Sequence, residues 1–541
     1  MPRVNALRDQ RRQQATQDEY QSYTIAAPVG GLNARDALAN MPETDAIILD
    51  NWFPQPTWVE IRGGQTPLAV FTGNPQTVAA YNSLSGLNQL FAGIVNGSTF
   101  GLYRVDNAGG GSPGAAVVGG VGNTVQPVTS VAYDWTQFGT GAAESLLMLN
   151  GADPPLNYDG TTWTAAALTN GPSPLSSLAY VTRYKSRLWF IQAGTFNVYY
   201  LPQNVFAGAL TLLNMAGNFN MGGSLAMMAT NSVDNSAGIN DYAAFVSTLG
   251  EVVLFQGYDP SAVATWSEAG HFQIGRPLAK GRRGWAKIGS DAAVICADGL
   301  IPLSKALVTD RSQPVVAISD KIRMALNADA KVYGTTFGWQ VVLYPMGTKL
   351  VVNMPVLINT QSYQYVQNTI SGAWCTFGKL NSPWNAICFE TMGDNLYYGA
   401  PGLVAQCDTG QSDNNAAILC TAKPAFSYMN QRPLQKLFTQ CQPIMQTTGK
   451  VTISVTLNVD FDTTAPTNSI PVSNGNAAVW NVSLWSTPTF WGDATQISKP
   501  WIGLGADGYS ASMQMRISAN LISVKWQSTN YLFKPCGLFY G

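Results

Sequence analysis

The chain has 541 residues, a net charge of −1 and 46% hydrophobic residues. Only 11% of its residues are charged, whereas typical soluble domains carry about 25%. Near-neutrality excludes a dedicated nucleic-acid binder with a strong basic excess. The low charge favours a chain covered by neighbouring subunits or a part of a robust extracellular particle. An ordinary all-β protein with a neutral polar surface is the third interpretation.

Cysteine and histidine usage argues against a zinc centre. Zinc sites draw on clustered Cys and His, and the chain has one histidine, His271, and no Cys-x-x-Cys. We expect the cysteines to be mostly buried, small apolar side chains in a reducing compartment, without a disulfide framework. There are seven of them: Cys296, Cys375, Cys388, Cys407, Cys420, Cys441 and Cys536.

Residues 1–29 read as a polar, Arg/Gln-rich N-terminal arm. The arm is either a disordered tail or a segment that orders on a neighbouring subunit. It lacks the apolar centre of a secretory signal, and no apolar run in the chain is long enough to span a bilayer. We therefore expect a soluble protein made in the cytoplasm.

Residues 30–65 begin and end with a Gly-Gly pair, and their first half carries a helix signal. Asn40 can cap a helix, Pro42 suits its first turn, and residues 47–49 would form its apolar side. The pattern predicts a short helix here.

An aromatic loop follows that helix signal. Trp52, Phe53, Pro54 and Trp58 lie close together in a stretch with no acid/base pair, thiol or phosphate loop. We interpret these residues as anchors that pack the 30–65 segment against a platform domain or another subunit.

From residue 66 to 425, short apolar runs come in pairs that Gly, Asn or Asp residues divide, which is typical of hairpins. Their spacing of roughly fifty residues suits one four-stranded propeller blade per hairpin. The pattern predicts an all-β fold with a β-propeller of six or seven blades, and stacked sandwiches are the alternative. The seven predicted hairpins start at Leu87, Ser145, Ser186, Tyr242, Asp291, Thr348 and Asn385.

Two long insertions interrupt the predicted propeller. Residues 107–127 are Gly-rich, and residues 204–240 are long for a connector. The second holds Met215, Met221, Met227 and Met228, which predict either an adaptable contact surface or a Met-filled corner of the core.

Residues 426–541 are predicted to form a separate antiparallel β-sandwich. Apolar residues alternate with polar ones from Val451 to Phe461, which is typical of a long strand with one solvated face. The stretches 512–518 and 521–527 alternate in the same way.

Candidate catalytic groups are few, and we expect no enzyme, cofactor or metal. A nucleophile–histidine device would have to centre on His271, whose context favours a structural role. Asp460 and Asp462 are typical of a solvated strand end. The Gly-rich stretch at Gly109 lacks the Lys-Ser/Thr of a phosphate loop. Residues 158–163, YDGTTW, resemble the Asp-box turn of sialidase-type propellers, which braces a turn and is not an active site.

The densest charge feature is one basic loop, with five cations in a chain that is otherwise poor in charge. The loop would either meet DNA phosphates, with a salt-dependent contribution, or form an exposed hairpin tip with solubilising charge. Its residues are Arg276, Lys280, Arg282, Arg283 and Lys287.

The opening strings GGLNARDALANMP, DNWFP and IRGG resemble a recurring beginning in structural proteins of short-tailed bacteriophages. The later strings LNYDGTTW, GEVVLFQGYDP, DGLIPLS, QYVQNTISGAW and LNVDFD resemble the same family, in the same order. The family is the tail nozzle, or tail hub, of podoviral virions (tail tubular protein B-like). The similarity runs over most of the chain from about residue 28.

This resemblance implies a propeller with a platform domain in the virion tail. Six copies would form a ring that retains and conducts genomic double-stranded DNA. The ring would dock a dodecameric head-to-tail adaptor, tail fibres or spikes, and a needle or plug protein. A rival interpretation is a tail-borne propeller that binds or hydrolyses host surface glycans, and a weaker one is a capsid-surface decoration protein.

Overall fold

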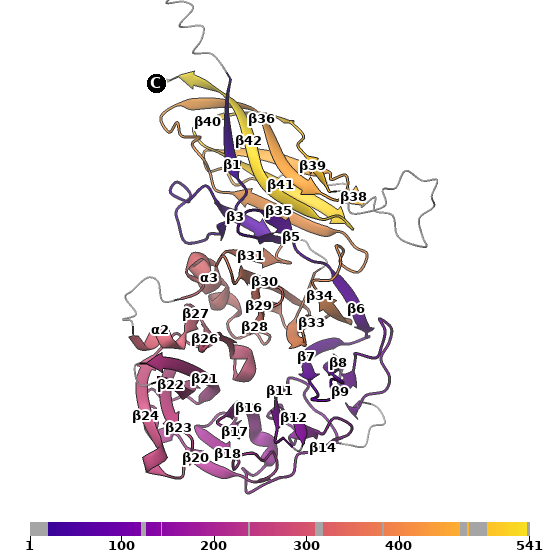
Figure 1. Cartoon of the computed structure of the whole chain (residues 1–541), viewed down its shortest axis with the longest axis vertical. Coiled ribbons are helices and arrows are strands. Elements are labelled where there is room, and N and C mark those ends of the chain that lie inside the picture. The colour runs from indigo at the N-terminus through magenta and orange to yellow at the C-terminus, as the bar shows by residue number, and fades with distance from the viewer. Residues whose placement is uncertain are drawn as a thin grey trace, which may run out of the picture. The chain divides into compact units, whose positions relative to one another are not determined.

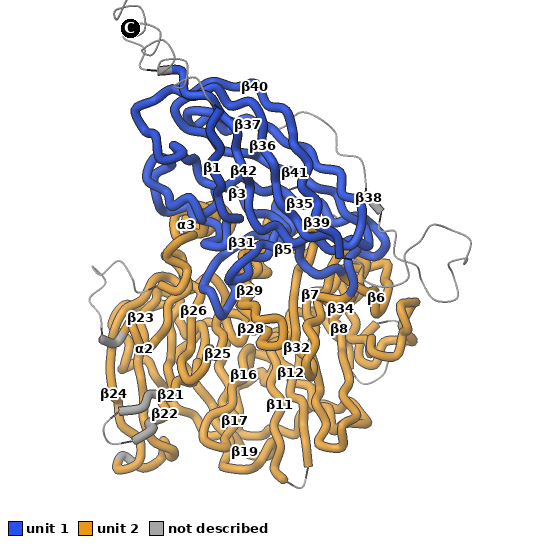
Figure 2. Tube along the Cα trace, turned by 45° about the horizontal axis from the view of Figure 1, so that its top comes forward, with its two compact units in different colours: residues 1–64, 367–383, 410–541 blue, residues 65–366, 384–409 orange. Residues whose placement is uncertain are grey.

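The chain divides into two compact units, shown in two colours in Figure 2. The structure is a computed structural model that describes residues 20–120, 126–141, 143–235, 238–308, 317–380, 384–465, 473–474 and 495–537. Unit 1 contains residues 1–64, 367–383 and 410–541, and unit 2 contains residues 65–366 and 384–409. The first nineteen residues of the predicted arm lie outside the described residues.

Unit 2 is a β-propeller with a six-blade arrangement, as predicted from the hairpin spacing. Its blade sheets follow one another around a ring in Figure 1, and each is antiparallel with neighbouring strands paired mostly in chain order. The first three sheets comprise β7 (Asn74–Tyr81), β8 (Gln89–Asn96), β9 (Thr99–Arg104) and β10 (Val118–Gly119); β11 (Asp134–Gly139), β12 (Glu144–Leu149), β13 (Leu156–Tyr158) and β14 (Trp163–Ala165); and β16 (Leu178–Tyr184), β17 (Arg187–Gln192), β18 (Asn197–Tyr200) and β20 (Thr211–Asn214).

The other three sheets complete the blades. They comprise β21 (Leu225–Asn235), β22 (Gly238–Ser247), β23 (Glu251–Gly257) and β24 (Trp266–Gln273); β25 (Trp285–Ile288), β26 (Asp291–Cys296) and β27 (Gly299–Pro302); and β32 (Cys388–Met392), β33 (Asn395–Ala400), β34 (Leu403–Cys407) and β6 (Gln65–Val70). The short strands β15 (Leu168–Thr169) and β19 (Gly208–Ala209) pair in parallel.

The last blade closes the ring. β6 comes first in the unit 2 sequence, yet it pairs antiparallel with β34, from Val70 opposite Leu403 to Gln65 opposite Cys407. The first strand and the last hairpin of the propeller therefore share one sheet, which removes the exposed edges that an open ring would leave.

Three further strands lie between the fifth and sixth blades. They are β28 (Gln340–Tyr344), β29 (Lys349–Leu357) and β30 (Gln361–Asn368), and they pair in that order. β28 contacts the inner strands β25 and β32 on either side, so it completes the wall around the ring centre. The helices α2 (Leu303–Val308) and α3 (Arg323–Tyr333) lie in the connection that leads to β28.

All seven predicted hairpins are present: β8–β9, β12–β13, β17–β18, β22–β23, β26–β27, β29–β30 and β32–β33. Apolar clusters pack between successive blades. Between the third and fourth blades, Trp189 and Trp266 stack with ring centroids 5.4 Å apart, and Phe245 packs against Trp189. Large apolar side chains buried between blades account for the hydrophobic runs in the sequence.

The insertion at 204–240 contributes strands and core, and is not a long connector. It contains β19, β20, all of β21 and the start of β22. Met215, Met227 and Met228 are buried, whereas Met221 is 46% exposed. Three of the four methionines therefore fill the core, in agreement with the second of the two interpretations.

Unit 1 consists of two sheets. One comprises β39 (Gln496–Ser498), β36 (Gln435–Thr447), β42 (Val524–Gly537), β5 (Val59–Ile61) and β4 (Trp52–Pro54), with β1 (Gln21–Ala26) and β40 (Ile502–Gly508) also paired to it. The other contains β31 (Trp374–Phe377), β3 (Asp45–Asp50), β35 (Ile418–Pro424), β41 (Ala511–Asn520) and β37 (Ile453–Val459), with β2 (Gly31–Leu32) and β38 (Ser473–Asn474).

Where the structure describes the strand pairings of unit 1, they are antiparallel with three exceptions. β2 pairs in parallel with β3, β3 with β31, and β38 with β41. The sulfur atoms of Cys441 on β36 and Met513 on β41 lie 3.7 Å apart, which places the two sheets face to face. The interior between the sheets is the core of the predicted platform.

The prediction of a short helix at residues 40–49 is wrong. Residues 45–50 form strand β3, which pairs with β35 through Ile48, Leu49 and Asp50. The β-branched Ile47 and Ile48 favour a strand, and two neighbouring strands satisfy the backbone there, so tertiary pairing overrides the capping signal.

Unit 1 also gathers segments that the sequence analysis placed at the end of the propeller. Residues 367–383 and 410–425 belong to unit 1, where β31 and β35 flank β3. From the predicted arm, β1 pairs with β42 of the same chain over six residues, from Gln21 opposite Phe533 to Ala26 opposite Ser528. The N-terminal segment of unit 1 is thus built onto its C-terminal strand.

Six of the seven cysteines are buried and Cys536 is exposed, and none forms a disulfide. Among the described residues, no helix is long and apolar enough to cross a membrane.

Candidate functional site

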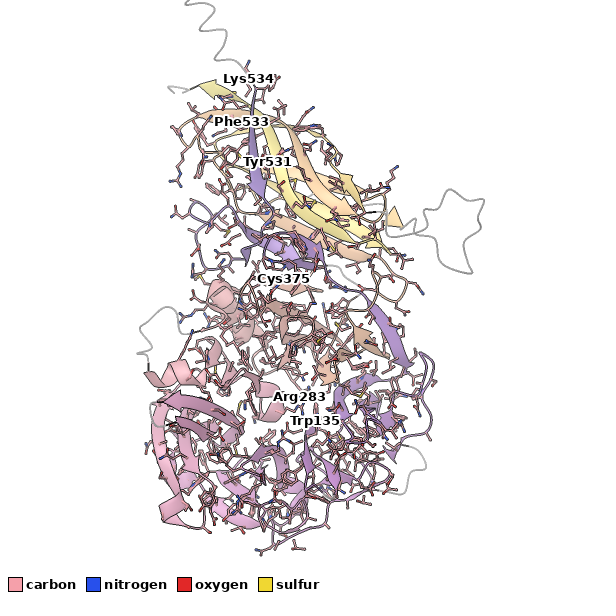
Figure 3. All side chains as sticks on the ribbon, in the orientation of Figure 1. Trp135, Arg283, Cys375, Tyr531, Phe533 and Lys534 are labelled. Carbon is pink, nitrogen blue, oxygen red and sulfur yellow. The ribbon has the colours of Figure 1, made fainter. Side chains whose placement is uncertain are left out.

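The centre of the propeller is occupied by a short 3₁₀ turn, η5 (Gly281–Gly284), which belongs to the predicted basic loop. The turn contacts the inner strands β11, β16, β21, β25 and β28. Figure 3 labels Arg283 and Trp135 at this central position, inside the ring of blades. The basic loop is therefore a central element of unit 2 and not an exposed hairpin tip.

Arg282 is half-buried and pairs with a buried carboxylate. Its Nη2 donates to both carboxylate oxygens of Glu390 on β32, at 2.6 and 2.9 Å. The guanidinium carbon lies 4.5 Å from the centroid of the Trp135 ring. Bidentate pairing and stacking on an aromatic face both suit the planar guanidinium, so Arg282 links the second and sixth blades.

Arg283 is only 6% exposed and lies against different partners. Its Nη2 donates to the Gln76 carbonyl at 2.6 Å and to Thr77 Oγ1 at 2.8 Å, and its guanidinium carbon is 5.0 Å from the Phe337 centroid. Burial lowers the pKa of Arg283 from its ordinary value. In the part of the chain that the structure describes, Arg283 Nη1 has no hydrogen-bond partner.

Two buried carboxylates accompany the arginines, and burial raises the pKa of each. The pKa of Glu390 rises to about 7, against the opposing effect of Arg282. The pKa of Asp134 rises to about 6, against hydrogen bonds from the backbone N–H groups of Val181 at 2.9 Å and Arg282 at 2.8 Å. Both carboxylates are engaged in holding η5 and the inner strands.

Two cavities lie beside η5. A cavity of about 710 Å³ is lined by Arg183, Lys185, Asp241, Arg282, Lys287 and Glu390, and we call it the paired cavity. A cavity of about 900 Å³ has Arg276, Lys280, Arg283 and Lys331 in its lining, and we call it the basic cavity. The neighbouring residues Arg282 and Arg283 line different cavities.

The five predicted loop cations therefore do not act as one patch. Arg282 and Lys287 line the paired cavity, and Arg276, Lys280 and Arg283 line the basic cavity. Arg276, Lys280 and Lys287 are exposed. Whether any of them meets DNA stays a prediction.

Gly281 shapes the turn, and its replacement is the first prediction. Gly281 has φ +59°, and a Cβ there would lie 2.6 Å from Tyr180 Cδ1 and 2.8 Å from Asp134 Oδ1. Gly289, in the same region, has φ +64° and nothing within 4 Å of its Cβ position. Gly289→Ala should cost about 1–2 kcal/mol of unfolding free energy for its left-handed backbone. Gly281→Ala should cost about 1–3 kcal/mol more, because the added methyl overpacks the centre.

Urea denaturation of the two variants measures this difference. Gly281→Ala should have the lower unfolding midpoint, and equal midpoints would contradict the packing of η5 against Asp134 and Tyr180.

The predicted anchor residues all lie in unit 1. Trp52, Phe53 and Pro54 form the buried strand β4, which pairs with β5, and β5 pairs with β42. Trp52 is 0% exposed, and its ring centroid lies 6.0 Å from that of Trp526. Trp58 is half-buried, its Nε1 donates to Glu60 Oε2 at 3.0 Å, and Lys525 Nζ lies 5.0 Å from its centroid.

The remaining motif residues have local partners. His271 Nε2 lies 2.7 Å from Glu251 Oε1, between the paired strands β23 and β24. Asp159 accepts hydrogen bonds from the backbone N–H groups of Thr161 and Thr162, which braces the YDGTTW turn between β13 and β14. Asp460 accepts from the backbone N–H groups of Tyr509 and Ser510. Within the described ranges, no group of three His, Cys, Asp or Glu residues could hold a metal ion.

The sequence analysis missed Lys331 on α3, which lines the basic cavity, and the carboxylates of Asp134 and Glu390, which meet the basic loop at the centre. Asp134 precedes Trp135 at the start of an inner strand, and Glu390 is a lone acidic residue in an apolar strand. A charged residue in a strand that is otherwise buried is the sequence signal that could have pointed to them.

No protein-family model matches the chain, and no curated protein sequence matches it. Among solved structures, the computationally designed Ika8 protein is 9% identical with a TM-score of 0.34, over 64% of this chain and 99% of that one. YCF48 from Cyanidioschyzon merolae is 12% identical with a TM-score of 0.35, over 65% and 98%. YCF48 bound to D1 peptide is 12% identical with a TM-score of 0.34, over 68% and 99%. TM-scores this low do not establish a shared fold. The propeller is assigned from the strand pairing of this chain.

Proposed function

We propose that the chain is a structural component of a short phage tail. In this proposal, copies of the chain form a ring-shaped nozzle or hub that retains and conducts genomic DNA. The ring docks an adaptor on one side and fibres or spikes on its outside.

The proposal rests on where the sequence segments that resemble the tail nozzle family lie in the fold. LNYDGTTW covers β13, its braced turn and the start of β14, GEVVLFQGYDP covers β23, and DGLIPLS covers β27. LNVDFD covers the end of β37 in unit 1. These strings are strands and turns of the two units, so the resemblance concerns architecture and not a catalytic centre.

The chemistry of the propeller centre supports the same proposal. A glycan hydrolase of the usual kind needs two carboxyl groups that are free to act as acid and as nucleophile or base. At this centre, Glu390 pairs with Arg282 and Asp134 accepts backbone hydrogen bonds. The low content of charged residues suits a chain with large contacts between subunits.

Electron microscopy of the purified protein, alone and mixed with the adaptor ring of the same phage, tests the proposal. The expected result is a closed ring, six-fold if the family resemblance holds, with a bore wide enough for duplex DNA. A chain that stays monomeric beside the adaptor contradicts the proposal. If that monomer also binds surface glycans on an array, the glycan-binding alternative is favoured.

A further inference from the structure

The basic cavity carries an excess of positive charge that its own walls do not neutralise. Four cations line it, Arg276, Lys280, Arg283 and Lys331, and Asp134 is the one carboxylate in its lining. Asp134 already accepts backbone hydrogen bonds from Val181 and Arg282. Among the described residues, none of the four cations forms an ion pair within 4.0 Å.

The paired cavity, on the other side of η5, is closer to charge balance: Arg183, Lys185, Arg282 and Lys287 line it together with the carboxylates of Asp241 and Glu390. There, Lys185 Nζ pairs with Asp241 at 2.5 Å, and Arg282 pairs with Glu390 at 2.6 Å. Two of its four cations thus have a carboxylate partner, whereas none of the four in the basic cavity has one among the described residues, although the two cavities meet at the same turn.

Two residues in the lining of the basic cavity, Arg283 and Tyr133, also carry buried polar atoms. Arg283 Nη1 and Tyr133 Oη are buried, and neither makes a hydrogen bond with any described residue. The two residues are tied together by Thr77, whose Oγ1 accepts from Arg283 Nη2 at 2.8 Å and from the Tyr133 backbone N–H at 3.1 Å. A buried guanidinium with an unused N–H is costly, and an anion bound in the adjoining cavity would offset that cost through its charge.

The mouth and the size of the cavity indicate the class of ligand. Arg276, Lys280 and Lys331 are exposed and line the cavity, while the partly exposed Tyr180 and Phe337 supply aromatic surface. A volume of about 900 Å³ is within the usual range for a small organic ligand. Arginine and lysine together recognise phosphate by charge and by directed hydrogen bonds.

We propose that the basic cavity binds a phosphate monoester, with the phosphate between the lysines and Arg283 and the organic body against the aromatic walls. The site is distinct from the DNA path of the proposed function, because a pocket inside one propeller admits a small group and not a duplex. The monoester could belong to a free small molecule or to the 5′ end of a nucleic acid strand.

Isothermal titration calorimetry on the full chain tests this proposal, with adenosine 5′-monophosphate and inorganic phosphate as probes. We expect saturable one-to-one binding of the monoester that weakens as salt is raised. The Lys280→Ser, Lys331→Ser double variant should bind it at least about tenfold more weakly, the size expected for losing charge-assisted contacts. Lys287→Ser is the matched control, because Lys287 is an exposed cation of the same loop that lines the paired cavity, and its affinity should equal that of the unaltered chain.

Two short oligonucleotides of one sequence, with and without a 5′-phosphate, identify the source of the ligand. Preference for the phosphorylated strand supports a nucleic-acid end, and binding of the mononucleotide alone supports a free small molecule. The proposal is overturned if neither monoester binds, if Lys287→Ser weakens binding as much as the double variant, or if both oligonucleotides bind and do so with the same affinity. Ring formation in the electron microscope should be the same for both variants, so the outcome does not depend on the proposed function.

Discussion

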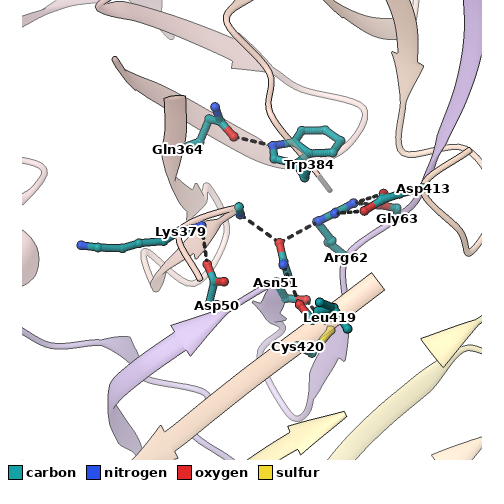
Figure 4. Close-up of polar contacts among 11 residues, drawn as sticks. Asp50, Asn51, Arg62, Gly63, Gln364, Lys379, Trp384, Asp413, Leu419 and Cys420 are labelled. Atoms are coloured by element: carbon teal, nitrogen blue, oxygen red, sulfur yellow. Dashed lines mark hydrogen bonds and ion pairs between the residues drawn. The ribbon is translucent and has the colours of Figure 1, made fainter. Parts of the chain in front are cut away.

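Replacing Arg62 with Ala is expected to lower the free energy of unfolding of unit 1 by about 3–5 kcal/mol. Arg62 and Asp413 form an ion pair whose side chains are 1% and 0% exposed. Arg62 Nη1 donates to Asp413 Oδ1 at 2.8 Å and Nη2 donates to Oδ2 at 2.5 Å, as Figure 4 shows. The substitution leaves the Asp413 carboxylate buried and without its cation, which is the costly part of breaking such a pair.

The same guanidinium also holds the turn that follows β3. Arg62 Nε donates to Asn51 Oδ1 at 2.8 Å, and Asn51 Nδ2 donates to the Leu419 carbonyl at 2.7 Å. Asn51 Oδ1 also accepts from the backbone N–H of Gly378 at 3.1 Å. Arg62 and Asn51 together thus connect the three chain segments of unit 1, and the loss of Arg62 should loosen all three.

Hydrogen exchange measured by mass spectrometry can locate the effect. Amides of β36 and β42 in unit 1 should exchange faster in Arg62→Ala, while those of β17 in unit 2 serve as the internal reference. Arg35→Ala is the control, because Arg35 pairs with Asp36 at the surface with 45% and 27% of the side chains exposed. Such an exposed pair should contribute less than about 1 kcal/mol.

A double replacement separates the buried charge from the loss of contacts. Arg62→Met with Asp413→Leu removes both buried charges, so it should destabilise unit 1 less than Arg62→Ala does. If the double variant is instead the less stable of the two, the ion pair contributes net stability and the stated mechanism is wrong.

The propeller could be predicted from the sequence because its hairpins are local. Each blade pairs neighbouring strands through short turns, so the alternation of apolar runs and Gly, Asn or Asp residues marks β8–β9 or β26–β27 without knowledge of the rest of the chain. Unit 1 could not be divided correctly by the same reasoning, because β3, β31 and β35 are neighbours in one sheet but come from three distant segments. No local sequence pattern indicates such pairing, whereas the local helix signal at Asn40 predicts a helix where strand β3 forms.

The cations of the candidate site could be predicted from the sequence, but their carboxylate partners could not. A run of cations such as Arg282–Arg283 stands out in a chain with few charges. The sequence does not show that Glu390 and Asp134, more than a hundred residues away from the loop on either side, come to the same centre. It also does not show that adjacent arginines line two different cavities, because that division depends on how η5 packs among inner strands from distant parts of the chain.

Replacing Trp52 with Ala is the second large effect, with an expected loss of about 3–5 kcal/mol from unit 1. Trp52 is fully buried and packs on Trp526, so the substitution opens a cavity beside β42. Trp52→Phe should cost much less, because it keeps an aromatic ring and removes an indole N–H that, among the described residues, has no hydrogen-bond partner. Urea denaturation of the two variants measures the difference, and equal losses would show that the N–H is satisfied.

The contrast between Trp52 and Trp58 decides how docking by this segment should be tested. Because Trp52 holds the core of unit 1, a failure of Trp52→Ala to assemble would reflect folding and say nothing about a docking surface. Trp58 is half-buried, its indole N–H donates to Glu60, and the Lys525 ammonium lies near its ring. Trp58→Ala should therefore change the unfolding free energy by about 1 kcal/mol or less, since partly exposed contacts contribute little. If the segment docks a neighbouring subunit, this variant should fold normally and yet form fewer rings in the electron microscope, and a normal yield of rings would place the docking surface elsewhere.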